Sequence, residues 1–340
     1  MQSRRSSGQM NILLTGGAGY IGSHTAVVLS QLGHQVVLYD NLSNSSDAVL
    51  EKLEQITGQQ MRFVRGDVRN TELLRNTLSS HSINSVIHFA GLKAVGESVE
   101  KPVDYFANNV QGTISLLQAM QLAQIKTLVF SSSATVYGEP QYLPMGENHP
   151  TSATNPYGRS KLHIEEMLND VAVSAPDWRI ACLRYFNPVG AHESGYIGEK
   201  PNSVPNNLMP YIAQVASGNR PVLTVFGGDY PTKDGTGVRD YIHVMDLAEG
   251  HAAALNFLSQ APGWHAVNLG TGKGYSVLEM VQAFEDASGR QVPYKIVDRR
   301  AGDVAACYAD PKMAIERLNW RATRNLQDMC TSAWHFQQSE

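Results

Sequence analysis

The chain has 340 residues, of which 42% are hydrophobic and 17% charged, and its formal net charge is −4. This composition is typical of a globular enzyme, and the charge gives no support for binding to nucleic acid or to an anionic membrane. No uninterrupted apolar run reaches the roughly 18 residues of a membrane-spanning helix. The cysteines Cys182, Cys307 and Cys330 are scattered, which excludes a disulfide framework and a metal-ligand spacing and fits a reducing cytoplasm.

The first nine residues are polar and basic and contain no apolar core. We therefore predict that residues 1–9 are a disordered leader or tag rather than a secretory signal, and we expect the fold to begin near Met10.

Strands and helices alternate through the first half of the chain. Short apolar runs predict strands at 11–15, 35–40, 61–65, 85–89, 126–132 and 179–184. Helical patterns lie between them, notably at 71–80, 108–123 and 157–173. Alternation of this kind predicts βαβ units and a Rossmann-type, doubly wound parallel sheet, an α/β fold.

A glycine-rich turn, Gly16–Gly22, directly follows the first strand. Gly17, Gly19 and Gly22 have the spacing that permits a tight turn, close approach of the backbone to a pyrophosphate, and close packing of helix on strand. Gly16 adds a second spacing, which is similar to that of the extended short-chain dehydrogenases. With a strand before it and a helix after it, the segment predicts a dinucleotide site.

Asp40 ends the second strand and selects the cofactor. A carboxylate there can accept hydrogen bonds from the adenosine ribose and would repel the extra phosphate of NADP, so we expect NAD. The alternative is that Asp40 only begins the turn that follows, because Asp favours turns.

Tyr157 and Lys161 lie four residues apart and therefore share a face of the predicted helix. A nearby ammonium favours the phenolate, which would let tyrosine act as a general base near neutral pH. The same spacing occurs in Tyr196…Lys200 and Tyr308…Lys312, but a glycine-rich loop and a proline make a helix improbable there.

Ser133 ends the strand about 25 residues earlier, at the edge where α/β sheets bind ligands. We predict that its hydroxyl bonds a substrate oxygen beside Tyr157. The alternative is that three consecutive serines simply end a strand.

After Phe186 the sequence becomes rich in Gly, Pro and Asn, especially over 187–241. We predict an NAD-binding domain at 10–186 and a smaller mixed α/β substrate lobe at 187–340. Segments near 240–270 are expected to return to the first domain.

Longer stretches resemble the UDP-glucose 4-epimerase family of the extended short-chain dehydrogenases. The resemblance runs from about residue 10 to 334 and is carried by 16–25, 88–98, 131–138, 183–192, 206–210 and 235–243. It implies cofactor contacts at Tyr20, Ile21, Asp40, Asn41, Asn44, Asp67, Val68, Phe89, Lys93, Asn108 and Phe186, in addition to the glycine turn. It implies a catalytic trio of Ser133, Tyr157 and Lys161, which also meets the cofactor. It implies UDP-sugar contacts at Ser133, Thr135, Tyr157, Asn187, Asn207, Phe226, Arg239, Arg300, Asp303 and Cys307.

The resemblance also implies a mechanism and a setting. Tyr157 removes the proton of the sugar 4-hydroxyl, the C4 hydride passes to NAD, and the 4-keto sugar turns and takes the hydride back on its other face. NAD should then stay tightly bound. The expected protein is a cytoplasmic homodimer of galactose metabolism, with helices around 98–123 and 157–173 at the interface. The small residue Cys307 predicts room for an N-acetyl group, and so activity on UDP-GlcNAc and UDP-GalNAc as well.

Three other interpretations remain open. A nucleotide-sugar 4,6-dehydratase would carry an Asp-Glu pair directly after the threonine that follows the serine strand. In this chain Val136 follows that threonine instead. A non-catalytic NAD sensor would typically lack the tyrosine or the lysine. A net sugar dehydrogenase would need exchangeable NAD, and the sequence excludes that interpretation least well.

The predicted UDP-sugar contacts also have a simpler interpretation, in which Arg300 and Asp303 form an ordinary ion pair of a loop.

Overall fold

The computed structural model describes residues 8–201 and 205–340. The predicted leader lies largely outside this part of the chain. Two compact units are distinguished. The first takes the described residues up to Ser132, then Asn155–Leu183 and His251–Ala266. The second takes those of Ser133–Thr154, Arg184–Gly250 and Val267–Glu340.

The main sheet has seven strands in the order β10-β6-β5-β4-β1-β2-β3. They are β1 (Asn11–Thr15), β2 (Gln35–Asp40), β3 (Arg62–Arg65), β4 (Ser85–His88), β5 (Thr127–Ser133), β6 (Arg179–Tyr185) and β10 (Gly263–Leu269). The pairs β1–β2, β1–β4, β2–β3 and β4–β5 are parallel. The strand order reverses between β1 and β4, where sheets of this kind bind ligands.

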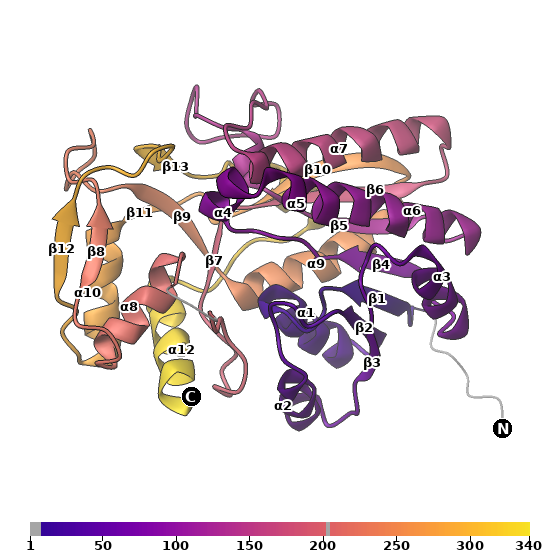
Figure 1. Ribbon diagram of the computed structural model, residues 1–340, viewed down its shortest axis with the longest axis horizontal. Coiled ribbons are helices and arrows are strands. Elements are labelled where there is room, and N and C mark those ends of the chain that lie inside the picture. The colour runs from indigo at the N-terminus through magenta and orange to yellow at the C-terminus, as the bar shows by residue number, and fades with distance from the viewer. Residues whose placement is uncertain (1–7, 202–204) are drawn as a thin grey trace. The chain divides into compact units, whose positions relative to one another are not determined.

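Helices cover the sheet of the first unit on both faces. They are α1 (Tyr20–Gln31), α2 (Ala48–Thr57), α3 (Thr71–Ser80), α4 (Val95–Glu100), α5 (Pro102–Tyr105), the π-helical η1 (Phe106–Gln111), α6 (Gly112–Leu122) and α7 (Pro156–Ser174). Figure 1 shows α6 and α7 along one face and α1 along the other. Because both faces are covered, β1, β4 and β5 are nearly continuous apolar runs. The predicted doubly wound fold is thereby confirmed.

The second unit has two smaller sheets. Its elements are the 3-10 turn η2 (Ala134–Val136), β7 (Asn187–Val189), α8 (Leu208–Ala216), β8 (Leu223–Phe226), β9 (Val238–His243), β11 (Gly274–Ser276), α10 (Val277–Ser288), β12 (Tyr294–Val297), β13 (Ala306–Cys307), α11 (Lys312–Leu318) and α12 (Leu326–Ser339). Strand β9 pairs with β7, β11 and β13, and β8 pairs with β12. Helix α9 (Val244–Leu258) begins in this unit and ends in the first.

The predicted elements of the first half match the structure to within two residues, with one difference. The helix predicted at 108–123 is a π-helical turn over Phe106–Gln111 that continues into α6. A π turn holds more residues than an α turn, so it shifts the helical period on which the prediction depended. Among the described residues, no helix has the length and apolar content needed to cross a membrane.

Candidate functional site

The glycine turn between β1 and α1 is packed too closely for side chains. Gly16 has φ +68°, and a Cβ there would lie 2.6 Å from the backbone nitrogen of Ala90. A Cβ on Gly17 would lie 2.8 Å from the Leu14 carbonyl oxygen, and one on Gly22 would lie 2.5 Å from the Gly16 oxygen. Glycine is therefore required for the turn to lie against the ends of β1 and β4.

The beginning of α1 is suited to an anion. Its N-cap is Gly19, no side chain caps it, and its first turn contains no acidic residue. Tyr20 and Ile21 are the first residues of the helix. The N–H groups at this N-terminus and the helix dipole favour a phosphate. The turn thus fits the pyrophosphate of the expected NAD.

Asp40 is buried at the end of β2, directly beneath this turn. One carboxylate oxygen accepts from the Ala18 N–H at 3.1 Å. The other accepts from the Leu42 N–H at 2.8 Å and from the Ser45 hydroxyl at 3.2 Å. Asp40 therefore does begin a turn, as the alternative reading held, and it also braces the glycine turn. A carboxylate offers about four acceptor positions, so capacity remains for a ribose hydroxyl.

Four further cofactor candidates follow β2 and β3. The Asn41 amide lies 3.4 Å from the Asp67 carboxylate, which also binds the Arg69 guanidinium. Hydrogen bonding to Arg69 lowers the pKa of Asp67 to about 2, so this carboxylate is ionised at neutral pH. Asn44 is exposed on the loop after β2. Val68 is buried, and its Cγ2 would lie 2.7 Å from a Cβ on Gly112.

The remaining cofactor candidates of this unit follow β4. The Phe89 ring packs against the His251 ring with centroids 4.9 Å apart. Lys93 is exposed on the next loop, and Asn108 is half-buried on η1. The following residue, Asn109, was not predicted. Its side chain bonds both backbone groups of Leu92 and also the Ser160 hydroxyl.

Asn109 therefore ties the loop after β4 to the beginning of α7. In the sequence, Asn109 is simply an amide within a predicted helix. Its burial, which obliges the amide to find partners, appears in the structure.

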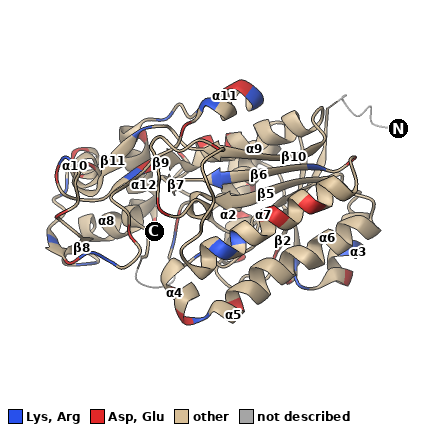
Figure 2. Cartoon of the chain, turned by 90° about the horizontal axis from the view of Figure 1, so that it is seen from above, with Lys and Arg blue, Asp and Glu red and all other residues tan. Residues whose placement is uncertain are grey.

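Tyr157 and Lys161 lie in the first two turns of α7. The helix begins there because the Asn155 side chain accepts from the Gly158 N–H and Pro156 occupies the first turn. The Lys161 ammonium is 5.9 Å from the Tyr157 ring centroid and 4.8 Å from the Phe130 centroid. Figure 2 shows the basic residues of α7 near its beginning and acidic residues further along.

Burial lowers the pKa of Lys161 to about 8. Its Nζ donates to the Ser131 carbonyl oxygen at 2.6 Å. The prediction that Lys161 lies beside Tyr157 is confirmed. Neither competing pair shares a helix: Tyr196 lies in a loop, and Tyr308 precedes α11, which begins at Lys312.

Ser133 is the last residue of β5. Its Oγ accepts from the Thr135 N–H at 3.2 Å and lies 2.9 Å from the Thr135 hydroxyl, which donates to it. The serine hydroxyl hydrogen remains available for another acceptor, because both of these contacts use oxygen lone pairs.

In the second unit, three predicted UDP-sugar contacts form one group. The Arg300 guanidinium lies 5.5 Å from the Phe226 ring centroid. It also makes two parallel bonds to the Asp303 carboxylate, at 3.1 and 3.2 Å. These side chains are exposed or half-buried, and the loop ion pair foreseen as the alternative is present.

Arg239 and Cys307 are partners across the β9–β13 pair. Arg239 Nη1 donates to the Val238 and Val304 carbonyl oxygens, each at 2.8 Å. Cys307 is half-buried, and burial raises the pKa of its thiol to about 11, so it is not a reactive thiolate at neutral pH.

The last three predicted residues are placed separately. Asn187 begins β7 and pairs with Tyr241 of β9. Asn207 precedes α8, and its amide donates to Glu199 at 2.6 Å. Phe186 is buried, and its N–H donates to the Leu269 carbonyl at 3.3 Å.

The chain is similar to known proteins along nearly its whole length. The family model described as GDP-mannose 4,6 dehydratase matches residues 13–333. A UDP-glucose 4-epimerase from Bacillus subtilis is 56% identical over 330 residues, covering 97% of each chain.

Solved structures agree. A UDP-glucose 4-epimerase from Stenotrophomonas maltophila, with bound NAD and formylated UDP-arabinopyranose, is 52% identical with a TM-score of 0.96, covering 97% of this chain and 98% of that one. One from Bifidobacterium longum, in complex with NAD+ and UDP, is 51% identical with a TM-score of 0.94 and the same coverage.

Proposed function

Because the chain belongs to the UDP-glucose 4-epimerase family of extended short-chain dehydrogenases, we propose that it interconverts UDP-galactose and UDP-glucose at sugar carbon 4. The observation that carries the proposal is the buried Lys161 ammonium beside the Tyr157 ring, on the helix that the sequence predicted. A positive charge there favours the phenolate over the phenol.

Each of the three catalytic residues has one task in this reaction. Tyr157, as phenolate, accepts the proton of the sugar 4-hydroxyl and later returns it. Lys161 supplies the stabilising charge. Ser133 donates its remaining hydroxyl hydrogen to the sugar 4-oxygen. When bound, NAD would supply a group that can accept the hydride of sugar carbon 4 and return it. Cofactor and protein would then be unchanged at the end of the cycle.

The other candidate residues are assigned by unit. We propose that the NAD-binding domain is 10–186, with Gly16, Gly17, Gly19, Tyr20, Ile21, Gly22, Asp40, Asn41, Asn44, Asp67, Val68, Phe89, Lys93, Asn108 and Phe186 as its contacts. The lobe 187–340 is assigned to the UDP-sugar, with Thr135 added from the earlier segment and Asn187, Asn207, Phe226, Arg239, Arg300, Asp303 and Cys307 from the lobe. Arginine suits a pyrophosphate because its fork binds two oxygens at once.

The residues after Ser133 weigh against the dehydratase reaction. That reaction needs an additional acid and base to eliminate water. Val136 is fully buried and apolar, and the Tyr137 hydroxyl donates to the Asn268 side chain at 2.6 Å. Neither residue offers a carboxylate.

We also propose that the substrate range includes the N-acetylated pair, UDP-GlcNAc and UDP-GalNAc. Cys307 supports this. By resemblance it falls where some family members carry tyrosine, and its small side chain leaves space that a tyrosine would fill. Overpacking at such a wall costs roughly 1–3 kcal/mol.

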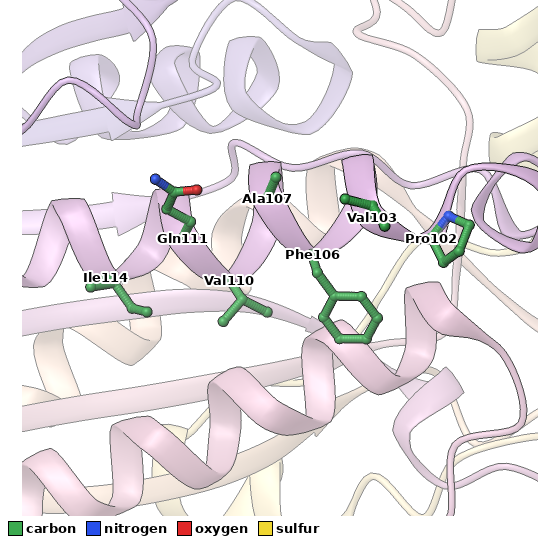
Figure 3. A pocket seen from close by; sticks show the side chains of 7 residues that line it. All are labelled: Pro102, Val103, Phe106, Ala107, Val110, Gln111 and Ile114. Atoms are coloured by element: carbon green, nitrogen blue, oxygen red, sulfur yellow. The ribbon is translucent and has the colours of Figure 1, made fainter.

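A homodimer is proposed on the basis of an exposed apolar surface on α4, α5, η1 and α6. Val99 and Val103 are 63% and 77% exposed. Val103 also lines an open pocket of about 430 Å³. The pocket is lined by Pro102, Val103, Phe106, Ala107, Val110, Gln111 and Ile114. Figure 3 shows Phe106, Val110 and Ile114 projecting from the same side of this segment. A second copy of the chain would cover both surfaces at once.

Light scattering at micromolar concentration should give twice the chain mass, and Val103→Glu should shift the protein to the monomer. A monomeric parent would overturn the dimer. We further propose a cytoplasmic location, in keeping with three free cysteines.

The test of the function uses purified protein with no added nucleotide. Incubation with UDP-galactose should yield UDP-glucose, and denatured protein should release about one NAD per chain. Protein that needs stoichiometric added NAD for turnover would point to a net dehydrogenase. Protein that produces a 4-keto-6-deoxy sugar would point to a dehydratase.

A further inference from the structure

Two adjacent serines at the end of β5 contact two charged residues of α7. The Ser131 carbonyl oxygen accepts from Lys161, and the Ser132 hydroxyl donates to a Glu165 carboxylate oxygen. All four residues are buried, with exposed fractions of 8% or less. The Ser131 contact uses the backbone, which any residue would supply, whereas the Ser132 contact uses the side-chain hydroxyl, so Ser132 does more than end a strand.

Glu165 lies one helical turn beyond Lys161, so the two side chains share a face of α7. It is only 2% exposed. A buried carboxylate is costly unless it is hydrogen-bonded and near a positive charge. Ser132 provides the hydrogen bond, and Lys161 provides the charge.

The groups that face Lys161 come from four elements. Helix α7 contributes Tyr157 and Glu165, β4 contributes His88, and β6 contributes Cys182. Strand β5 contributes an aromatic ring and a carbonyl oxygen. His88 is itself neutral, because burial and the Lys161 charge lower its pKa to about 3. Glu165 is therefore the carboxylate in this set.

Burial alone drives the pKa of Lys161 down toward neutrality, whereas the charge of Glu165 raises it. Without that carboxylate, the lysine would lose its proton at a lower pH. Tyr157 would then lose the positive charge that favours its phenolate.

We propose that Glu165, held by Ser132, is a positioning residue that keeps Lys161 protonated beside Tyr157. The inference rests on the proposed function, in which Tyr157 is the base. It assigns a role in proton transfer to a residue that acts only through Lys161.

The test compares Glu165→Gln with Glu166→Gln, a matched change at the neighbouring exposed residue. Turnover of UDP-galactose by the NAD-loaded enzyme is measured from pH 6 to pH 10. Glu165→Gln should move the alkaline limb to lower pH by about one unit, which lowers turnover at high pH about tenfold. The KM for UDP-galactose should stay unchanged. Ser132→Ala should move the limb in the same direction by less.

A second readout does not depend on activity. The absorbance of phenolate at 295 nm is titrated in each protein, and the titration of its Tyr157→Phe counterpart is subtracted. The remaining signal reports Tyr157, and it should appear at higher pH when Glu165 is replaced.

Superimposable profiles for the parent and Glu165→Gln, or an equal shift in Glu166→Gln, would overturn the inference. If Glu165→Gln does not fold, an unshifted limb in Ser132→Ala overturns it instead. A parent with no epimerase activity would overturn the proposed function, and the absorbance titration would still decide the role of Glu165.

Discussion

Lys161 Nζ donates a 2.6 Å hydrogen bond to the carbonyl oxygen of Ser131. This bond fixes the second turn of α7 against the end of β5. The ammonium is therefore positioned before any substrate arrives. A charge held in place in this way stabilises the phenolate better than a mobile charge, because it need not reorganise during the reaction. The position of Tyr157, one turn earlier, follows from the same anchoring.

Replacement of Tyr157 by phenylalanine should lower turnover at least a hundredfold, since a general base contributes about 10² to 10⁴. Binding of the UDP-sugar should persist because only the hydroxyl is removed. Turnover and equilibrium binding of UDP-galactose are the measurements.

The matched control is Tyr196→Phe, which alters the exposed tyrosine of a competing Tyr…Lys pair. It should leave turnover unchanged. Near-normal turnover in Tyr157→Phe would remove Tyr157 from the mechanism.

Replacement of Asp40 by alanine should reduce the NAD content of the purified protein and weaken discrimination against NADP. The carboxylate would no longer meet a ribose hydroxyl or repel a phosphate. The Ala18 and Leu42 N–H groups would also lose their acceptor, so a lower melting temperature is expected.

Asp47→Ala is the control, because Asp47 is exposed and its side chain does not cap α2. Unaltered cofactor content and selectivity in Asp40→Ala would leave Asp40 as a turn residue only.

Replacement of Cys307 by tyrosine should abolish activity on UDP-GlcNAc and largely spare activity on UDP-galactose. The added ring would occupy space beside Arg239 in the β9–β13 pair. The ratio of the two turnover numbers is the measurement, and Cys307→Ser, which stays small, should keep the parental ratio. A parent without N-acetyl turnover, or an unchanged ratio in Cys307→Tyr, contradicts the idea.

His88 should make the fold sensitive to acid. Thr113 donates its hydroxyl to the Asn109 carbonyl, so His88 Nε2 donates to Thr113 at 3.0 Å and Nδ1 accepts from Thr15 at 2.6 Å. This arrangement needs a neutral ring, and the pKa of His88 is lowered to about 3, mainly by burial.

The unfolded chain binds the His88 proton near pH 6.5 and the folded chain does not, so stability falls as pH drops from about 6.5 toward 3. At pH 5 the loss is about 2 kcal/mol. Chemical denaturation at several pH values should show a shallower pH slope for His88→Gln than for the parent. The exposed His163→Gln should keep the parental slope. Equal slopes for the parent and His88→Gln would contradict this account.

The sequence predicted the main sheet well because its inner strands, such as β1 and β6, are almost wholly buried and carry largely apolar runs. It also identified Tyr157 and Lys161, since Asn155 and Pro156 mark the beginning of their helix. Both signals are local, so a single sequence contains them.

The signals that were missed depend on distant contacts. The π-helical turn η1, where the helical period shifts, was not predicted within the helix expected at 108–123. The pairing of Glu165 with Ser132 joins residues 33 positions apart. No individual helix or strand was predicted in the Gly-, Pro- and Asn-rich region 187–241, but it contains β7, α8, β8 and most of β9, which are packed through long-range contacts.

The central claim is that the hydrogen on sugar carbon 4 leaves and returns to the same carbon. UDP-galactose deuterated at carbon 4 tests it most directly, with purified protein, no added NAD, and mass and NMR analysis of the product. The account predicts UDP-glucose that retains deuterium at carbon 4, with no net change in absorbance at 340 nm. Loss of the label to water, or accumulation of an oxidised sugar together with NADH, would contradict it.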